Sequence, residues 1–409
     1  MRRPLTFHFL PLVAVVVALG CASRPPEWPL QAWQREAGGK GLRLLVLEGD
    51  PYTAGLIHGR TLAQEVRAAI DAFHTALHEE FGEEGARRIL DWLTHRTKYF
   101  EDLRRYAPEL VQEMRGIAEG AGVSFEEVWR LQLREMVFEA APLMLRLPLP
   151  GRPPLRACTL FATRDLSNAL LVGQSIDAYA SEIVGPPIVF VHPLSNGSRL
   201  LRVSFAGEVG GAGLSSKGFA LMSAGTPQGL QDGLRGLPPG VVSRLALASS
   251  SRLEAIGQIA DLPRAGSATY VLADRRQAIA LETSSVNARA EIMSRAGLAR
   301  SNHLLRLPNR VDIPQWFAHG EPINRDRSSS FATLERLRVM RESIASGQIA
   351  AWRLRSLLGR PPIYMRGEVQ TSSALLIRFQ ASTAELWSAS SNARGLDWQR
   401  HVIALERRP

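Results

Sequence analysis

The chain has 409 residues, of which 45% are hydrophobic and 22% are charged, as in ordinary globular proteins. This composition excludes disordered, collagen-like and disulfide-scaffold proteins. The formal net charge is +10, but nearly all of the 49 basic residues are arginines scattered along the chain, without zinc-finger spacing, an aromatic RNA-binding strand or a basic helix. We therefore predict no nucleic-acid partner. The charge indicates an arginine-rich surface, for which an anionic membrane face is the partner left open.

The first 21 residues are typical of an export signal. Arg2 and Arg3 form a positive region, and the apolar stretch that follows, Leu5–Gly20, is too short to predict a membrane-spanning helix. The stretch ends at Cys21 and resembles a bacterial lipoprotein signal. The resemblance implies lipidation of Cys21 and an exported, periplasm-facing lipoprotein anchored to a membrane, the outer one by preference, with residues 22–41 as a tether. An ordinary cleaved signal that ends near a cysteine is the alternative, because Ala18 stands where leucine is usual.

The residues that follow the tether are predicted to be mostly helical. A short strand is expected at 43–48 and helices at 61–77, at 108–118 and from Ser124 to Phe138. Ser124 and Glu127 have capping-box spacing at the start of the third helix. Residues 142–154 contain five prolines, which excludes a helix and predicts an exposed loop.

From residue 158 onward the pattern changes to short strands with hairpin-length connections. Strands are predicted at 159–163, 169–176, 187–192, 199–205, 218–223, 268–273, 278–283, 372–379 and 384–390, with a tight glycine-rich turn at 207–213 and helices at 241–260 and 331–344. The order of helices, then antiparallel strands, then helices predicts an α+β protein in which sheets are packed between helical layers.

Cys158 is the one cysteine outside the signal, and it lies where the predicted loop meets the first strand. Such a thiol is either a nucleophile or a small buried hydrophobe, and the residues alone leave both open. Cys21 and Cys158 differ too much in context to predict a disulfide, and they cannot build a metal site. We predict no metal and no cofactor, and we interpret His74 and His78 as part of a solvated helix face.

Six motifs occur along the chain in a fixed order. They are Gly49–Gly59, Glu113–Ala121, Ala157–Thr159, Gly173–Asp177, Gly213–Ser223 and Ser301–His303. The series resembles the acyl-coenzyme A:6-aminopenicillanate acyltransferase family (isopenicillin N acyltransferase-like) of cysteine N-terminal-nucleophile hydrolases, from about residue 44 to 390. The resemblance implies a four-layer αββα sandwich of antiparallel sheets. Residues 42–157 would form a helical α fragment and residues 158–409 a strand-rich catalytic β fragment, together one domain.

The same resemblance implies a precursor that cleaves itself between Ala157 and Cys158. The thiol would attack the preceding carbonyl, water would release the thioester, and the freed α-amine, with a pKa of about 8, would be the general base for its own thiol. Asn302 would stabilise the oxyanion, Asp177 would orient the amine or the thiol, and Thr159 would support the nucleophile. The implied substrate is a small N-acyl amide or thioester, and hydrolysis is favoured over transfer because coenzyme A donors are cytoplasmic.

The resemblance also concerns residues outside the immediate surroundings of Cys158. The resemblance places Arg366 and Glu282 among substrate-binding residues, although Glu282 is also compatible with packing, and it implies structural roles for His58, as a turn anchor, and His303. The departures are Ala157 for glycine, Ser175 for asparagine, Thr333 for an arginine that Arg336 follows, and Gln370 for a second arginine. Ser175, Thr333 and Gln370 leave open an inactive envelope lipoprotein that keeps the fold to bind ligands. A further alternative is an unrelated periplasmic binding domain in which Cys158 is merely buried.

Overall fold

The computed structural model describes residues 43–145, 156–179, 183–194, 197–226, 234–308, 333–367, 369–392 and 394–406. All of them belong to one unit, which spans Ala32–Pro409. The predicted signal, the predicted lipidation site Cys21 and the predicted tether lie outside the described residues, as do residues 146–155 of the predicted proline-rich loop. Among the described residues, no helix combines the length and the apolar character that crossing a membrane requires.

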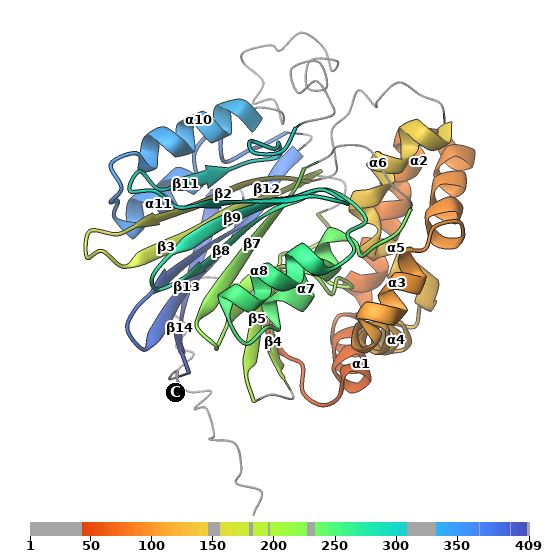
Figure 1. The fold of residues 1–409 in the computed structure, drawn as a ribbon. Coiled ribbons are helices and arrows are strands. Elements are labelled where there is room, and N and C mark those ends of the chain that lie inside the picture. Colours follow the sequence, from red (N-terminus) through yellow and green to blue (C-terminus); the bar gives the residue numbers. More distant parts are fainter. Residues whose placement is uncertain are drawn as a thin grey trace, which may run out of the picture. The chain divides into compact units, whose positions relative to one another are not determined.

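Two β-sheets form the centre of the fold (Figure 1). The eight-stranded sheet has the order β1 (Arg43–Val46), β4 (Ile188–Pro193), β5 (Arg199–Ser204), β6 (Ala212–Ser215), β7 (Phe219–Gly225), β8 (Ala268–Asp274), β9 (Ala278–Thr283) and β10 (Ala288–Ile292). The six-stranded sheet has the order β11 (Leu298–Arg300), β2 (Arg156–Arg164), β3 (Leu170–Tyr179), β12 (Val369–Phe379), β13 (Thr383–Asn392) and β14 (Gly395–Ala404). Neighbouring strands are antiparallel except β1 and β4, which are parallel.

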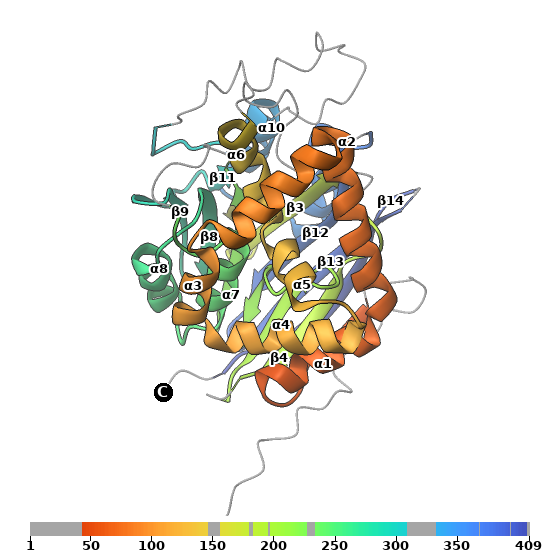
Figure 2. The same ribbon diagram turned by 90° about the vertical axis from the view of Figure 1, so that its right-hand side faces the viewer.

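The sheets pack face to face, with β2 and β3 against β7 and β8, and helices cover both outer faces. One hydrophobic cluster joins the eight-stranded sheet to the helices that precede β2 and those that follow β7 (Figure 2). These helices are α1 (Pro51–Thr61), α2 (Ala63–His95), α3 (Tyr99–Tyr106), α4 (Pro108–Ala121), α5 (Phe125–Gln132), α6 (Arg134–Leu145), α7 (Pro239–Leu247) and α8 (Arg252–Asp261). A second cluster joins the six-stranded sheet to α10 (Thr333–Ile344) and α11 (Ala351–Leu358). The predicted αββα sandwich is therefore confirmed.

Glycines allow α1 and α4 to pack backbone against backbone. A Cβ atom added to Gly55 would lie 1.9 Å from the Glu113 carbonyl oxygen, and one added to Gly116 would lie 2.1 Å from the Tyr52 carbonyl oxygen. No side chain fits at such distances, so the glycines of the first two sequence motifs set how closely the helices approach. The predicted capping box is also confirmed, since Ser124 and Glu127 each bond to the other's backbone N–H.

Some predicted elements are wrong in extent. The prediction that no helix enters 142–154 fails at its start, because α6 continues to Leu145. Pro142 therefore lies inside the helix, where its missing N–H removes one backbone hydrogen bond. The single helix predicted at 241–260 is two helices, and Ser251 caps the second by accepting a hydrogen bond from Glu254 N–H. The glycine turn ends two residues early, because β6 begins at Ala212.

Candidate active site

Cys158 lies in β2, paired with Ile176 of β3, and its side chain is buried. It borders a cavity of about 80 Å³ between the two sheets, whose wall also includes parts of α5, α6 and α7. The bond between Ala157 and Cys158 lies within β2, two residues from the start of the strand. The predicted cleavage position is therefore at the edge of the cavity that would receive a substrate.

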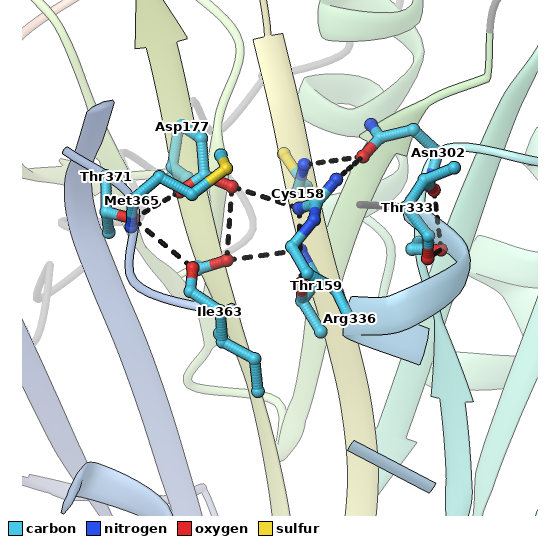
Figure 3. A network of polar contacts seen from close by, with 12 residues as sticks. Cys158, Thr159, Asp177, Asn302, Thr333, Arg336, Ile363, Met365 and Thr371 are labelled. Carbon is cyan, nitrogen blue, oxygen red and sulfur yellow. Dashed lines mark hydrogen bonds and ion pairs between the residues drawn. The ribbon is translucent and has the colours of Figure 1, made fainter. Parts of the chain in front are cut away.

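Asn302 holds the backbone of Cys158. Its Oδ1 atom accepts a hydrogen bond of 2.8 Å from Cys158 N–H, and its Nδ2 atom donates one of 2.9 Å to the Gly225 carbonyl (Figure 3). Asn302 follows β11 and Gly225 ends β7, so the amide links the two sheets beside Cys158. The structure thus brings Asn302 to Cys158 as predicted, with its carbonyl oxygen on the nitrogen that cleavage would convert to an α-amine.

Arg336 lies at the centre of the network (Figure 3). From α10, its Nη2 atom donates to Asn302 Oδ1 at 2.9 Å, and its Nη1 atom donates to Thr159 Oγ1 at 3.2 Å and to Asp177 Oδ2 at 3.1 Å. The guanidinium is buried and its charge is balanced by Asp177. The sequence motifs assign no role to Arg336 and place Thr333 at the position of a replaced arginine. Thr333 and Arg336 nevertheless have S-x-x-R spacing between them, with threonine for serine.

Asp177 is connected to Cys158 through Arg336 and Asn302. Its Oδ1 atom accepts a hydrogen bond of 2.6 Å from the Thr371 hydroxyl, and its Oδ2 atom accepts one of 3.4 Å from Ser175. Burial raises the pKa of Asp177 to about 7, although Arg336, Thr371 and Ser175 act in the opposite direction. Asp177 can therefore change its charge near neutral pH, and Thr371, which sequence reasoning missed, helps to keep it ionised.

Ser175 takes part in the site even though it departs from the family pattern. Its hydroxyl accepts a hydrogen bond of 3.2 Å from Thr159 N–H and donates to Asp177. Both Ser175 and Thr159 are fully buried. The serine therefore keeps a polar link between β2 and β3 directly beside Cys158.

A group of hydroxyls fixes Asn302 from behind. Asn302 N–H donates to Thr333 Oγ1 at 3.0 Å, and the Thr333 hydroxyl donates to Ser301 Oγ at 2.8 Å. His303 Nδ1 lies 3.2 Å from Ser301 Oγ and 3.1 Å from Thr333 Oγ1. Burial, followed by nearby arginines, lowers the pKa of His303 to about 4, so the ring is neutral at pH 7. Its contacts agree with the structural role predicted for it.

The two predicted substrate-binding residues lie elsewhere. Glu282 is fully buried, pairs with Arg300 at 2.9 Å and accepts hydrogen bonds from the backbone N–H groups of 305–307, so of its two predicted roles the structure supports packing. Arg366 is exposed, with its guanidinium over the Tyr364 ring. Neither residue borders the cavity at Cys158. Gln370 donates to the Gly367 carbonyl, and it is its neighbour Thr371 that reaches the site.

His58 anchors a turn, as predicted, but from within a helix. Its Nε2 atom accepts a hydrogen bond of 2.9 Å from Gly207 N–H, in the connection between β5 and β6. Burial, with a smaller contribution from Arg202, lowers the pKa of His58 well below its usual value, so the ring is neutral. Among the described residues, no group of three His, Cys, Asp or Glu side chains is placed to hold a metal ion.

A layered αββα fold with a cysteine at the inner face of β2 is the arrangement that the sequence motifs implied. The family model described as acyl-coenzyme A:6-aminopenicillanic acid acyl-transferase matches residues 166–344, which include Asp177, Asn302 and Arg336. This match confirms the resemblance. A penicillin V acylase from Agrobacterium tumefaciens is a structural neighbour with a TM-score of 0.40 and 11% identity, covering 59% of this chain and 85% of its own. No curated protein matches the chain.

Proposed function

We propose that the chain is a cysteine amidohydrolase or acyltransferase that cleaves itself before Cys158 and then acts on small N-acyl amides or thioesters through a Cys158 acyl-enzyme. The observation that carries the proposal is the Cys158–Asn302–Arg336 arrangement beside a cavity. The family match supports acyl-transfer or amide-hydrolysis chemistry in general.

Self-cleavage starts from the peptide bond inside β2. The Cys158 thiol attacks the Ala157 carbonyl carbon, a C–S bond forms, the C–N bond breaks, and the Cys158 nitrogen takes up a proton. Water then hydrolyses the thioester, which releases the Ala157 carboxylate and regenerates the thiol. Asn302 Oδ1 already accepts from this nitrogen, so the same contact would hold the new α-amine.

In each later turnover the α-amine of Cys158 is the base. An α-amine has a pKa of about 8, so a useful fraction is neutral near pH 7 and can take the thiol proton as sulfur attacks the substrate carbonyl. The ammonium then protonates the leaving amine, and water or an acceptor amine releases the acyl group. The second N–H of Asn302 Nδ2 is assigned to the oxyanion, because its other N–H is engaged by Gly225.

Arg336 and Asp177 are positioning residues in this scheme. A guanidinium has a rigid planar fork, so Arg336 fixes Asn302 Oδ1 and Thr159 in one geometry. Hydrolysis is favoured over transfer if the first 21 residues export the chain and Cys21 carries a lipid anchor, since acyl-coenzyme A is cytoplasmic. We retain that location as part of the proposal.

The test is intact mass and N-terminal sequencing of protein produced without residues 1–21. We expect two co-purifying fragments, the larger beginning Cys158-Thr159-Leu160, and one uncleaved, inactive chain from Cys158→Ala. Cleavage or turnover that survives Cys158→Ala would overturn the proposal. A wild-type chain that stays intact and inactive would support an inactive, ligand-binding lipoprotein instead.

A further inference from the structure

The connection between β5 and β6, residues 205–211, forms one wall of the cavity at Cys158. Phe205, Glu208, Gly210 and Gly211 of this β5–β6 turn border the cavity together with Cys158. Gly207 has a φ of +82° and Gly211 a φ of +135°, so the turn follows a path that side chains rarely allow. The position of its backbone therefore decides how much space lies beside the thiol.

Gln132, the last residue of α5, holds the middle of the turn. Its Nε2 atom donates a hydrogen bond of 2.8 Å to the Gly207 carbonyl, and its Oε1 atom accepts one of 3.1 Å from Val209 N–H. His58 of α1 accepts from Gly207 N–H at 2.9 Å. Two side chains of the predicted α fragment thus satisfy backbone groups of a turn in the β fragment.

Arg202 holds the same turn from the opposite direction. Its Nη1 atom donates hydrogen bonds of 2.9 Å to the carbonyls of Glu208 and Gly210. The guanidinium is fully buried, lies 4.2 Å from the centre of the Phe190 ring, and pairs with Glu113 of α4 at 3.6 Å. A buried cation with these partners is fixed in position, so the two carbonyls are fixed as well.

On its far side the turn contacts α7 with no space between them. A Cβ atom added to Gly210 would lie 2.8 Å from Gly240, which also borders the cavity. The turn therefore cannot move further toward α7. If its hydrogen bonds are removed, we expect the space beside Cys158 to change, because residues of the turn form part of the cavity wall.

We propose that Gln132, with His58 and Arg202, determines specificity by fixing the β5–β6 turn and so limiting the size of the group that fits beside Cys158. As a statement about substrate selectivity, this inference rests on the proposed function. It gives the helical fragment a part in recognition through His58 of α1 and Gln132 of α5, and Gln132 also borders the cavity itself.

The test compares Gln132→Leu with a matched control, Gln258→Leu. Gln258 is a half-buried glutamine of α8 that accepts a hydrogen bond from Ser249 and does not border the cavity. The readout is the ratio of Cys158 alkylation rates by iodoacetamide and the bulkier iodoacetanilide, measured by mass spectrometry on native protein. We expect a change of about threefold or more in this ratio for Gln132→Leu, and the wild-type ratio for Gln258→Leu.

An unchanged ratio in folded Gln132→Leu would overturn the inference, and so would an equal change in the control. Gln132→Glu is the second variant in case leucine prevents folding; it keeps the acceptor for Val209 and loses the donor to Gly207, so a smaller shift is expected. Alkylation needs the thiol but no turnover. A wild-type protein that alkylates at Cys158 and hydrolyses no substrate would therefore contradict the proposed function, while the ratio still tests the turn.

Discussion

Arg336 donates hydrogen bonds to side chains on three separate segments: Thr159 on β2, Asp177 on β3 and Asn302 after β11. Because all three acceptors meet one planar cation, their relative positions are fixed by the guanidinium rather than by the strands alone. A lysine would supply the charge but not the fork. The geometry of Arg336, more than its charge, is what the site requires.

We expect Arg336→Lys to fold and to lose about 10- to 100-fold in kcat/KM, because the loss of one charge-assisted hydrogen bond costs about 1.5–3 kcal/mol. The loss should fall mainly on kcat, since Arg336 acts on Asn302 and not on the cavity wall. Arg338→Lys, at an exposed position of the same helix, is the control and should match the wild type. Steady-state kinetics on any amide that the wild type hydrolyses decides the matter, and equal rates for both variants would contradict the role.

Thr371 should set the pH dependence of the site. Its hydroxyl lowers the pKa of Asp177, which burial raises to about 7. We expect activity to fall as pH decreases through this value, because protonated Asp177 no longer neutralises Arg336, and we expect Thr371→Val to move that fall to higher pH. Thr371→Ser, which keeps the hydroxyl, should restore the wild-type profile. A pH–rate profile of Thr371→Val that coincides with the wild type would exclude this link.

The ionisation of Asp177 also affects the stability of the fold, in the opposite direction from its expected effect on activity. The folded pKa of Asp177, about 7, is above the value of about 3.9 for an unfolded chain, so protonation favours the folded state. This contribution is complete below about pH 4 and is lost as pH rises through about 7. We therefore expect the proposed activity to be highest where Asp177 contributes least to stability.

At the scale of elements, α1 and α4 approach through glycines at both helix faces. Gly116→Ala would place a Cβ atom 2.1 Å from the Tyr52 carbonyl oxygen, so the helices must move apart, and we expect a loss of about 1–3 kcal/mol in the free energy of unfolding. Gly257→Ala is the matched control, since a Cβ atom there meets open space in α8 and should stabilise the helix by about 0.5–1 kcal/mol. Urea denaturation of both variants measures the difference, and similar midpoints would contradict the packing argument.

The sequence pattern predicts elements well where burial is visible in the chain itself. The strands that correspond to β2, β3, β8 and β9 are buried almost throughout and were all expected. β10 and β14 were not, because both are edge strands with mostly exposed or half-buried residues, so their pairing depends on the neighbouring strand and not on their own alternation. The eight-residue α11 is too short for its periodicity to be detected.

The residues of the candidate site likewise divide into those that a local motif predicts and those that only the folded structure brings together. Cys158, Thr159, Asp177 and Asn302 were predicted from motifs, and the structure brings all four together. Thr371 was missed because it meets Asp177 only through the pairing of β12 with β3, and no local pattern marks such a contact. Arg336 does leave a signal in the sequence, because it follows Thr333 at the spacing of an S-x-x-R pattern.

For the molecule as a whole, buried charges join the helices of residues 42–157 to the rest of the fold. Glu113 of α4 lies 3.6 Å from Arg202 of β5 and 3.6 Å from Arg244 of α7, and all three side chains are nearly inaccessible to solvent. If the chain is cut before Cys158, these contacts cross between the two fragments. Removing one partner of a buried ion pair leaves the other charge buried and uncompensated, which strongly destabilises the fold.

We therefore expect Glu113→Gln to lower the free energy of unfolding by about 3–5 kcal/mol, because it leaves two buried arginines without their anion. Glu335→Gln, at an exposed position of α10, is the control and should leave the urea midpoint nearly unchanged. In processed protein, size-exclusion chromatography in increasing urea should show the two fragments of Glu113→Gln separating at a lower concentration than those of the wild type. If the fragments of Glu113→Gln separate at the same urea concentration as those of the wild type, apolar contacts between the helices and the eight-stranded sheet are sufficient to hold the fragments together. Glu113 would then only offset the burial of Arg202 and Arg244.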